Sequence, residues 1–274
     1  MVPSRHIGSS KSIKVWFKEL ITKHETLYFL IWRDLKVQYG NFILGLLWSV
    51  FQPILYFGAI VGMFSADKTS VNSNSIPFPV FIFSGIIIWN FFTNAVNGCV
   101  SNIQANAGII SKSYFPRYFL VLSPFIRCML DLLISSFLLL LLAIFTQSSF
   151  SNVGWWSIPM AAILLFLTTL GLATIATISV VYNRHLRHGI PMLLYAGLFL
   201  MPVFHYIPTI KFAFVRILYQ ANPLSVAIRL VRSAFGNQII SVPEICIATI
   251  LAFSIFIFGI IAFRRFENTL ADRV

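Results

Sequence analysis

The sequence has 274 residues, of which 58% are hydrophobic and only 10% are charged, and its mean hydropathy is +0.85. Soluble domains carry about a quarter charged residues, so this composition excludes a soluble globular protein and indicates an integral membrane protein. The formal net charge of +12 does not indicate a nucleic-acid partner, because the basic residues are scattered at the ends of apolar runs, where they orient membrane spans.

The N-terminal segment 1–42 is expected to be cytoplasmic and to contain an amphipathic helix. Apolar residues recur there at helical spacing, at Ile13, Trp16, Phe17, Leu20, Ile21, Leu27, Tyr28 and Ile31. A basic helix with aromatic residues on its apolar side is expected to lie in the membrane interface. A soluble helix packed on a partner protein stays open as an alternative. We expect no removable signal peptide, because no apolar core followed by a small-residue cleavage site is present.

Six apolar runs are long enough to cross a hydrocarbon core of about 30 Å, which takes roughly 20 helical residues. They cover approximately 43–64, 79–104, 119–146, 157–182, 190–207 and 243–263. The membrane domain therefore covers 43–263, and 264–274 forms a C-terminal tail. An even number of spans puts both termini on one side. Most of the 20 Lys and Arg residues fall on that side, so the positive-inside rule predicts cytoplasmic termini.

The second span carries an uncharged hydrogen-bonding stripe with aromatic residues at its start. Polar residues follow one another there at helical spacings of four, three and four. Asparagine side chains donate and accept hydrogen bonds as sugar hydroxyls do, so the stripe is a candidate channel lining; interhelical hydrogen bonding is the alternative. The candidates for channel lining are Trp89, Asn90, Phe92, Asn94, Asn97 and Ser101.

The third span contains two charged residues, Arg127 and Asp131, four positions apart. Charges inside a membrane are costly, and this spacing predicts an intramembrane pair that largely neutralises both. Structural anchoring is the simplest role for such a pair.

The segment 106–118, which precedes this span, is short, basic and aromatic, and its Lys112, Pro116 and Arg117 exclude a membrane crossing by the segment itself.

The segment 209–236 is too polar for a further span and too apolar for a loop. It predicts one or two short helices that dip into the outer half of the membrane. Asn222 is the expected N-cap, Pro223 the first helical residue and Gly236 the stop. Arg229 and Arg232 are three apart and are expected to share a face.

No motif in the sequence indicates catalysis. A nucleotide-binding Gly-x-x-x-x-Gly-Lys-Ser/Thr motif is absent. His185 and His188 are close, but no carboxylate accompanies them, and the three cysteines are widely spaced, so we expect neither a metal site nor a disulfide. The sequence predicts a chain that is not an enzyme.

Three stretches together resemble the permease subunits of polysaccharide-exporting ATP-binding-cassette transporters, which export O antigen, capsule or teichoic acid. They are "WRDLKVQYGNFILGLLWSVFQPIL" (32–55), "NAGIISKSYFPRYFLVLSPFIRCMLD" (106–131) and "ANPLSVAIRLVRSAFGN" (221–237). The resemblance runs from about residue 14 to the C-terminus. It implies a half-transporter, in which two copies of a six-span permease bind two copies of a separate ATPase. ATP and Mg would be held by that ATPase, and no cofactor by this chain.

The same resemblance suggests roles for three segments. Residues 13–35 would form the interfacial helix, and 209–236 the periplasmic gate helices, with Arg229 and Arg232 near the exit. The segment 106–118 would be the coupling helix that contacts a groove of the ATPase. Its contact residues would be Lys112, Tyr114, Phe115, Pro116 and Arg117. The chain departs from the family in "YNRHLRHG", where His185 follows Arg184 in place of the usual acidic residue.

The sequence thus predicts an all-α integral membrane protein with six transmembrane helices, an N-terminal amphipathic interfacial helix, a cytoplasmic coupling helix and short re-entrant periplasmic gate helices. The expected function is the permease subunit of an ATP-driven exporter of lipid-linked polysaccharide, most simply O antigen, in the bacterial inner membrane. The expected partners are a second permease, two ATPase subunits, membrane lipids and the glycan, with no nucleic acid. The alternatives are a type 2 exporter of a drug, haem or small lipid, a membrane-embedded glycosyltransferase or flippase that works without ATP, and a non-transporting assembly scaffold.

Overall fold

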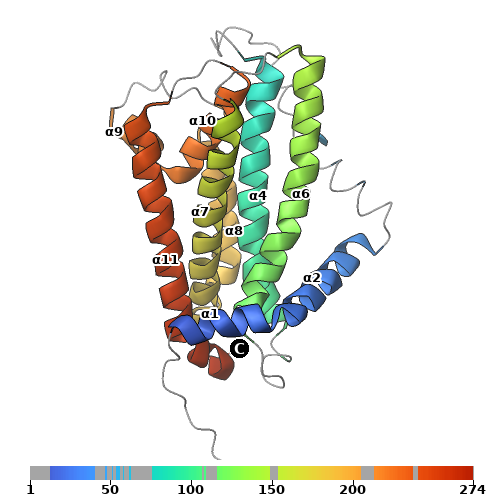
Figure 1. Cartoon of the computed structure of the whole chain (residues 1–274), viewed down its shortest axis with the longest axis vertical. Coiled ribbons are helices and arrows are strands. Elements are labelled where there is room, and N and C mark those ends of the chain that lie inside the picture. Colours follow the sequence, from blue (N-terminus) through green and yellow to red (C-terminus); the bar gives the residue numbers. More distant parts are fainter. Residues whose placement is uncertain are drawn as a thin grey trace, which may run out of the picture.

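The computed structural model describes residues 13–40, 76–106, 116–148, 154–204, 213–236 and 240–273, and also residues 47, 51, 54, 55, 58, 62 and 108. Within these ranges the protein is all-helical and contains no strand, as predicted (Figure 1). The helices are α1 (Ile13–Thr22), α2 (His24–Tyr39), α4 (Phe78–Ala105), α6 (Phe119–Phe145), α7 (Gly154–Tyr182), α8 (Leu186–Leu200), α9 (Ala213–Ala221), α10 (Pro223–Ala234) and α11 (Val242–Arg273).

Four described helices are long and apolar enough to cross a membrane. They are Phe78–Ala105, Phe119–Phe145, Trp156–Tyr182 and Val242–Glu267. They coincide within a few residues with four of the six predicted spans, which confirms those spans as helices. The predicted first span, 43–64, lies almost wholly outside the described residues.

The predicted span over 190–207 is only partly present, as α8. This helix has 15 residues and is therefore about 22 Å long, which is shorter than the hydrocarbon core. It ends because Met201 adopts an extended conformation with ψ of 154°, as expected for a residue that precedes a proline, here Pro202. The hydropathy of the sequence continues past Pro202, which is why the predicted span is longer than the helix; residues 205–207 lie outside the described ranges.

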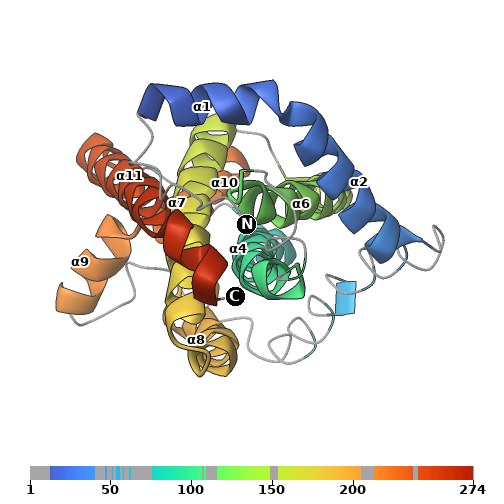
Figure 2. The same cartoon turned by 90° about the horizontal axis from the view of Figure 1, so that it is seen from below.

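The long helices form a bundle in which α4 is central (Figures 1 and 2). Of its most apolar stretch 78% is buried, against 22% for α6 and 17% for α11, so α4 contacts protein on most sides. Helix α7 packs against α4 and α11. Helices α7 and α11 approach closely at two glycines, because a Cβ atom on Gly171 would lie 2.9 Å from the backbone of Ile255, and one on Gly259 would lie 2.9 Å from the carbonyl of Gly171.

The N-terminal segment forms two helices, α1 and α2, that lie across one end of the bundle, where α11 also ends (Figure 1). One side of the pair packs on the bundle through Trp16 and Leu30, which are 4% and 5% exposed. Other apolar side chains, including Tyr28, Phe29 and Trp32, are more than half exposed. A helix pair with one face on protein and another apolar face open suits a position in the membrane interface.

Two short helices, α9 and α10, occupy the region where the sequence predicts one or two. Asn222 caps α10 as predicted, because its side-chain oxygen accepts a hydrogen bond of 3.0 Å from the amide of Leu224. Pro223 is the first residue of the helix. The helix ends one residue earlier than predicted, with Phe235 rather than Gly236 as its C-cap residue.

Candidate functional site

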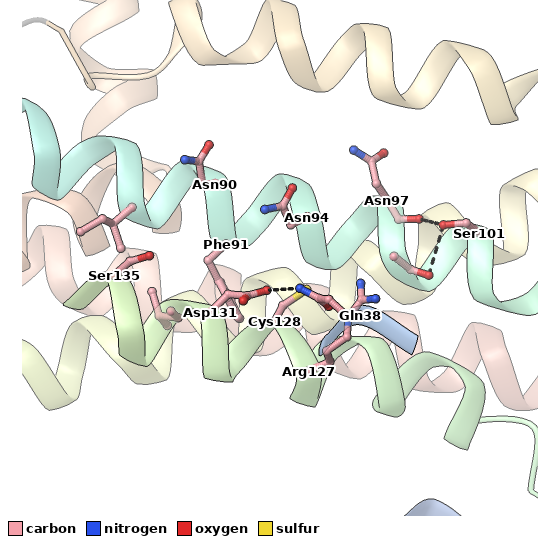
Figure 3. A pocket seen from close by; sticks show the side chains of 13 residues that line it. Gln38, Asn90, Phe91, Asn94, Asn97, Ser101, Arg127, Cys128, Asp131 and Ser135 are labelled. Carbon is pink, nitrogen blue, oxygen red and sulfur yellow. Dashed lines mark hydrogen bonds between the residues drawn. The ribbon is translucent and has the colours of Figure 1, made fainter. Parts of the chain in front are cut away.

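A polar cavity of about 370 Å³ lies between α2, α4 and α6 (Figure 3). Helix α4 contributes Asn90, Asn94, Asn97 and Ser101, which are the stripe predicted from the sequence. Helix α6 contributes Arg127, Asp131 and Ser135, and α2 contributes Gln38. The helical spacing of the stripe therefore places all four of its residues along one cavity. Their role as a channel lining stays a prediction.

A second cavity of about 330 Å³ adjoins the first on the side of α2. The two cavities share Gly98, Ser101 and Arg127 as lining residues. The second is also lined by Arg33, Asp34 and the two asparagines at the end of α4, Asn102 and Asn106. A series of polar side chains thus runs from the end of the bundle that α2 covers toward the middle of α4.

A hydrogen-bond network fixes α2 to the ends of α4 and α6. Arg33 donates from Nε and Nη2 to Asp34 Oδ1, at 3.1 and 2.7 Å, and from Nη1 to Asn106 Oδ1 at 2.6 Å. Ser123 donates to Asp34 Oδ2 at 2.7 Å. Asn102 donates to Ser123 at 3.1 Å, and Asn106 donates to Asn102 Oδ1 at 2.8 Å. Sequence reasoning did not assign these residues to the site; the only signal was Arg33–Asp34, two adjacent residues of opposite charge in the middle of α2.

The predicted ion pair between Arg127 and Asp131 is not formed in the described part of the chain. Instead, Tyr39 donates from its hydroxyl to Asp131 Oδ1 at 2.5 Å, and Gln38 donates from Nε2 to Asp131 Oδ2 at 3.4 Å. Both carboxylate oxygens are therefore satisfied by α2. The buried Nε of Arg127 has no hydrogen-bond partner.

The two aromatic channel candidates, Trp89 and Phe92, do not line either cavity. Both are buried, with ring centroids 5.3 Å apart. Trp89 packs on α8, where a Cβ atom on Gly197 would lie 2.9 Å from the indole ring. In this conformation Trp89 belongs to the contact between α4 and α8.

The two arginines expected near an exit have different surroundings. Arg229 forms a salt bridge with Glu244 at the start of α11, and Gln220 of α9 donates to the same carboxylate at 3.4 Å. Arg232 is only 2% exposed and donates to the backbone carbonyls of Phe81, Pro202 and Val203. Arg232 thus connects α10 to α4 and to the end of α8, and its guanidinium is not open to a ligand.

The predicted coupling residues lie mostly outside the described residues, as is the case for Lys112, Tyr114 and Phe115. Pro116 is buried, and Arg117 donates to the backbone carbonyl of Glu267 near the end of α11.

Tyr118, the next residue, forms an aromatic cluster with Trp16 of α1 and Phe263 of α11, with centroid distances of 5.4 and 5.2 Å. Burial raises the pKa of Tyr118 to about 12, so its phenol is neutral at physiological pH. The C-terminal end of the segment 106–118 is therefore packed against both α1 and α11.

A metal centre has no support in the described residues, among which no group of three His, Cys, Asp or Glu side chains is close enough to hold an ion. His185 and His188, the closest histidines in the sequence, are both exposed.

Comparison with known proteins places these features in context. Residues 25–236 match the ABC-2 type transporter family, and this range includes every residue that lines either cavity. The chain is 27% identical over 244 residues to "O-antigen export system permease protein RfbA" of Klebsiella pneumoniae, which covers 88% of this chain and 91% of that protein. It is 30% identical over 212 residues to the protein of the same name from Myxococcus xanthus, covering 76% and 78% of the two chains. A shorter similarity, 30% over 86 residues, links 31% of this chain to 33% of "Polysialic acid transport protein KpsM" of Escherichia coli.

Proposed function

Because the chain belongs to the ABC-2 type transporter family, we propose that it is the permease subunit of an ATP-driven exporter that moves a lipid-linked polysaccharide across the bacterial inner membrane. The observation that carries the proposal is the similarity to an O-antigen export permease over 88% of this chain and 91% of that protein. O antigen is therefore the first substrate to test, with capsule and teichoic acid as related glycans.

The proposed assembly is a homodimer of six-span permeases with two ATPase subunits that hold ATP and Mg. Four of the six spans would be the four long helices, and the segments 43–64 and 190–207 would form the other two. Both termini would be cytoplasmic. One structural feature supports a common side for the two termini and the coupling segment. Trp16 near the N-terminus and Arg117 at the end of the proposed coupling segment both bind Glu267 near the C-terminus, so these three parts of the chain lie at one end of the bundle (Figure 1).

In this proposal, α9 and α10 are the gate helices on the opposite side of the membrane. Arg229, with its salt bridge to Glu244, lies where α9, α10 and α11 meet. Arg232 would fix α10 in place rather than contact the glycan, because its guanidinium is buried against backbone carbonyls.

The polar cavity supports a role in solvating sugars. The amides of Asn90, Asn94 and Asn97 donate and accept hydrogen bonds, and all three lie along one cavity within a helix that is long and apolar enough to span the membrane. Polar side chains inside a membrane are costly, so they are retained where they bind another helix, water or a substrate.

The first test is deletion of the gene in its native host, followed by analysis of surface and intracellular glycan. We expect a bare surface and intracellular accumulation of lipid-linked glycan, whose composition identifies the substrate. Unchanged surface polysaccharide without accumulation would contradict the proposal and point to an exporter of a small substrate, such as a drug, haem or lipid.

A second test uses Asn94→Leu and Asn97→Leu in the complemented strain. Surface polysaccharide should fall at unchanged permease abundance, and the matched changes Asn94→Gln and Asn97→Gln, which keep the amide, should retain more export. If the leucine variants export normally, the stripe serves helix packing and not the glycan.

A further inference from the structure

Three buried polar atoms without a hydrogen-bond partner belong to residues that line the first cavity. They are Arg127 Nε, Asn97 Oδ1 and Gln38 Oε1. Buried polar groups in folded proteins are nearly always hydrogen-bonded, so each exception calls for an explanation, and a role in binding is one. These three comprise one cationic donor and two neutral acceptors. The side chains that line the cavity include the same two kinds of group, a guanidinium and neutral amides. An occupant matched to this lining would combine an anionic oxygen with hydroxyl groups.

The carboxylates that line the two cavities do not provide that oxygen. Asp34 is bound by Arg33 and Ser123, and each of its oxygens accepts a hydrogen bond of 2.7 Å. Asp131 is bound by Tyr39 and Gln38. Arg127 therefore forms no ion pair within the described residues, although it lies in a membrane-spanning helix. An ionisable side chain inside a membrane that forms no ion pair is a candidate for a functional site.

Arg127 lies at a depth in the bundle where it can contact a ligand group that is near the membrane surface. It lies eight residues after the first residue of α6, which is about 12 Å along the helix at 1.5 Å per residue. Gly98 of α4 lies beside it, since a Cβ atom there would be 3.4 Å from Arg127 Nη2. The guanidinium also lines the second cavity, which lies on the side of α2. Arg127 thus lies where the two cavities meet. Figure 3 shows it among the residues that line the first cavity.

The chemistry of the lining matches a phosphate ester of a sugar. A planar guanidinium binds phosphate oxygens with two parallel hydrogen bonds. The amides of Asn97 and Asn94, which follow along α4, can bind sugar hydroxyls as donors and acceptors. A volume of about 370 Å³ is in the range of small-molecule sites and is large enough for a phosphate with its first sugar.

We propose that Arg127, with the amides of Asn97 and Asn94, binds the glycosyl phosphate junction of the substrate, where the phosphate of the lipid carrier joins the first sugar. The inference rests on the proposed function and specifies where the substrate is recognised. Recognition at this junction makes binding independent of the sugars farther along the glycan, because only the phosphate and the first sugar enter the cavity.

The test is a binding measurement on the purified full-length permease in detergent. The probes are a short-chain polyprenyl diphosphate that carries one sugar, the same lipid without the sugar, the free polyprenol and inorganic pyrophosphate. Binding is measured by isothermal titration calorimetry for the wild type, Arg127→Gln, Arg127→Lys and the control Arg187→Gln, which changes an exposed arginine outside both cavities.

Arg127→Gln should weaken binding of the glycosylated diphosphate at least tenfold, and Arg127→Lys should weaken it less, because lysine keeps the charge but not the planar donors. Arg187→Gln should bind as the wild type does. Polyprenol affinity and the size-exclusion profile should be unchanged in all variants, which separates loss of the site from loss of the fold. Removal of the sugar should also weaken binding, through the asparagines.

Three outcomes would overturn the inference. Equal affinity of Arg127→Gln and the wild type for the glycosylated lipid would place the phosphate elsewhere. Binding of inorganic pyrophosphate as tight as that of the lipid, and dependent on Arg127, would show a site for free phosphate. Equal binding with and without the sugar would leave the asparagines without a role. A wild-type protein that binds none of the lipid probes would instead contradict the proposed function itself, so the two failures are distinguishable.

Discussion

The buried Arg232 offers a direct test of how the helices are held together. Its guanidinium donates four hydrogen bonds, two to Phe81 O at 3.0 and 3.2 Å, one to Pro202 O at 2.8 Å and one to Val203 O at 2.8 Å. It also lies 3.5 Å from the centroid of the Phe81 ring. No carboxylate among the described residues neutralises it. Backbone carbonyls and an aromatic face therefore stabilise this charge.

The expected cost of Arg232→Met follows from these contacts. Phe81 O keeps another donor, the hydroxyl of Ser84 at 2.9 Å, whereas the carbonyls of Pro202 and Val203 lose theirs. Two buried carbonyls without a donor cost about 1–3 kcal/mol each. Loss of the cation–π contact adds about 1–2 kcal/mol, and removal of a buried charge offsets part of the sum. We expect a net loss of about 4 kcal/mol.

The assay is thermal unfolding of the purified protein in detergent, followed by size-exclusion chromatography. At about 2 °C per kcal/mol for a chain of this size, Arg232→Met should lower Tm by about 8 °C. Gly85→Ala should also lower Tm, because its Cβ atom would lie 3.0 Å from Arg232 Nη2 and 3.2 Å from Val203 Cα. Gly189→Ala is the matched control, since nothing lies within 4 Å of its Cβ position. A Tm of Arg232→Met within 2 °C of the wild type would refute the assigned role.

Three further experiments test other contacts. Gly171→Leu should prevent accumulation of folded protein, because even a Cβ atom there would lie 2.9 Å from the backbone of Ile255; a monodisperse variant at normal yield would contradict the close packing of α7 and α11. Asn222→Ala should cost about 1 kcal/mol, seen as a Tm lower by about 2 °C, through loss of the cap of α10, and an unchanged Tm would show that the cap is dispensable. Trp16→Phe and Glu267→Ala each remove one partner of a 3.1 Å hydrogen bond, so a double-mutant cycle should show coupling of about 1 kcal/mol, whereas additive effects would refute the contact.

The sequence predicts the long helices and the polar stripe because both depend on local periodicity. Four spans follow from runs of about 25 apolar residues, and the alignment of Asn90, Asn94, Asn97 and Ser101 follows from 3.6 residues per turn. The N-cap at Asn222 is equally local. In each case the information lies within a few turns of one helix.

The missed features depend on partners that are distant in sequence. Spacing within α6 suggests that Arg127 and Asp131 pair, but the carboxylate is bound by Tyr39, 92 residues away, and by Gln38. The burial of Arg232 is also beyond local reasoning, since its acceptors are backbone carbonyls up to 151 residues away, which no side-chain pattern reveals. Polar residues in membrane helices are recognisable from sequence, whereas their choice of partner depends on the packing of the helices.

These polar contacts hold α4 at both ends. Near its start, Phe81 O accepts from Arg232 of α10, and just after its end, Asn106 accepts from Arg33 of α2. The asparagine stripe and the cavity lie between these two points. The wall opposite α4 includes Gln38 of α2 and Asp131 of α6, which bind each other. A shift of α2 relative to α4 must therefore break the contact of Arg33 with Asn106 and move one wall of the cavity, while the contact with Arg232 keeps the start of α4 in place.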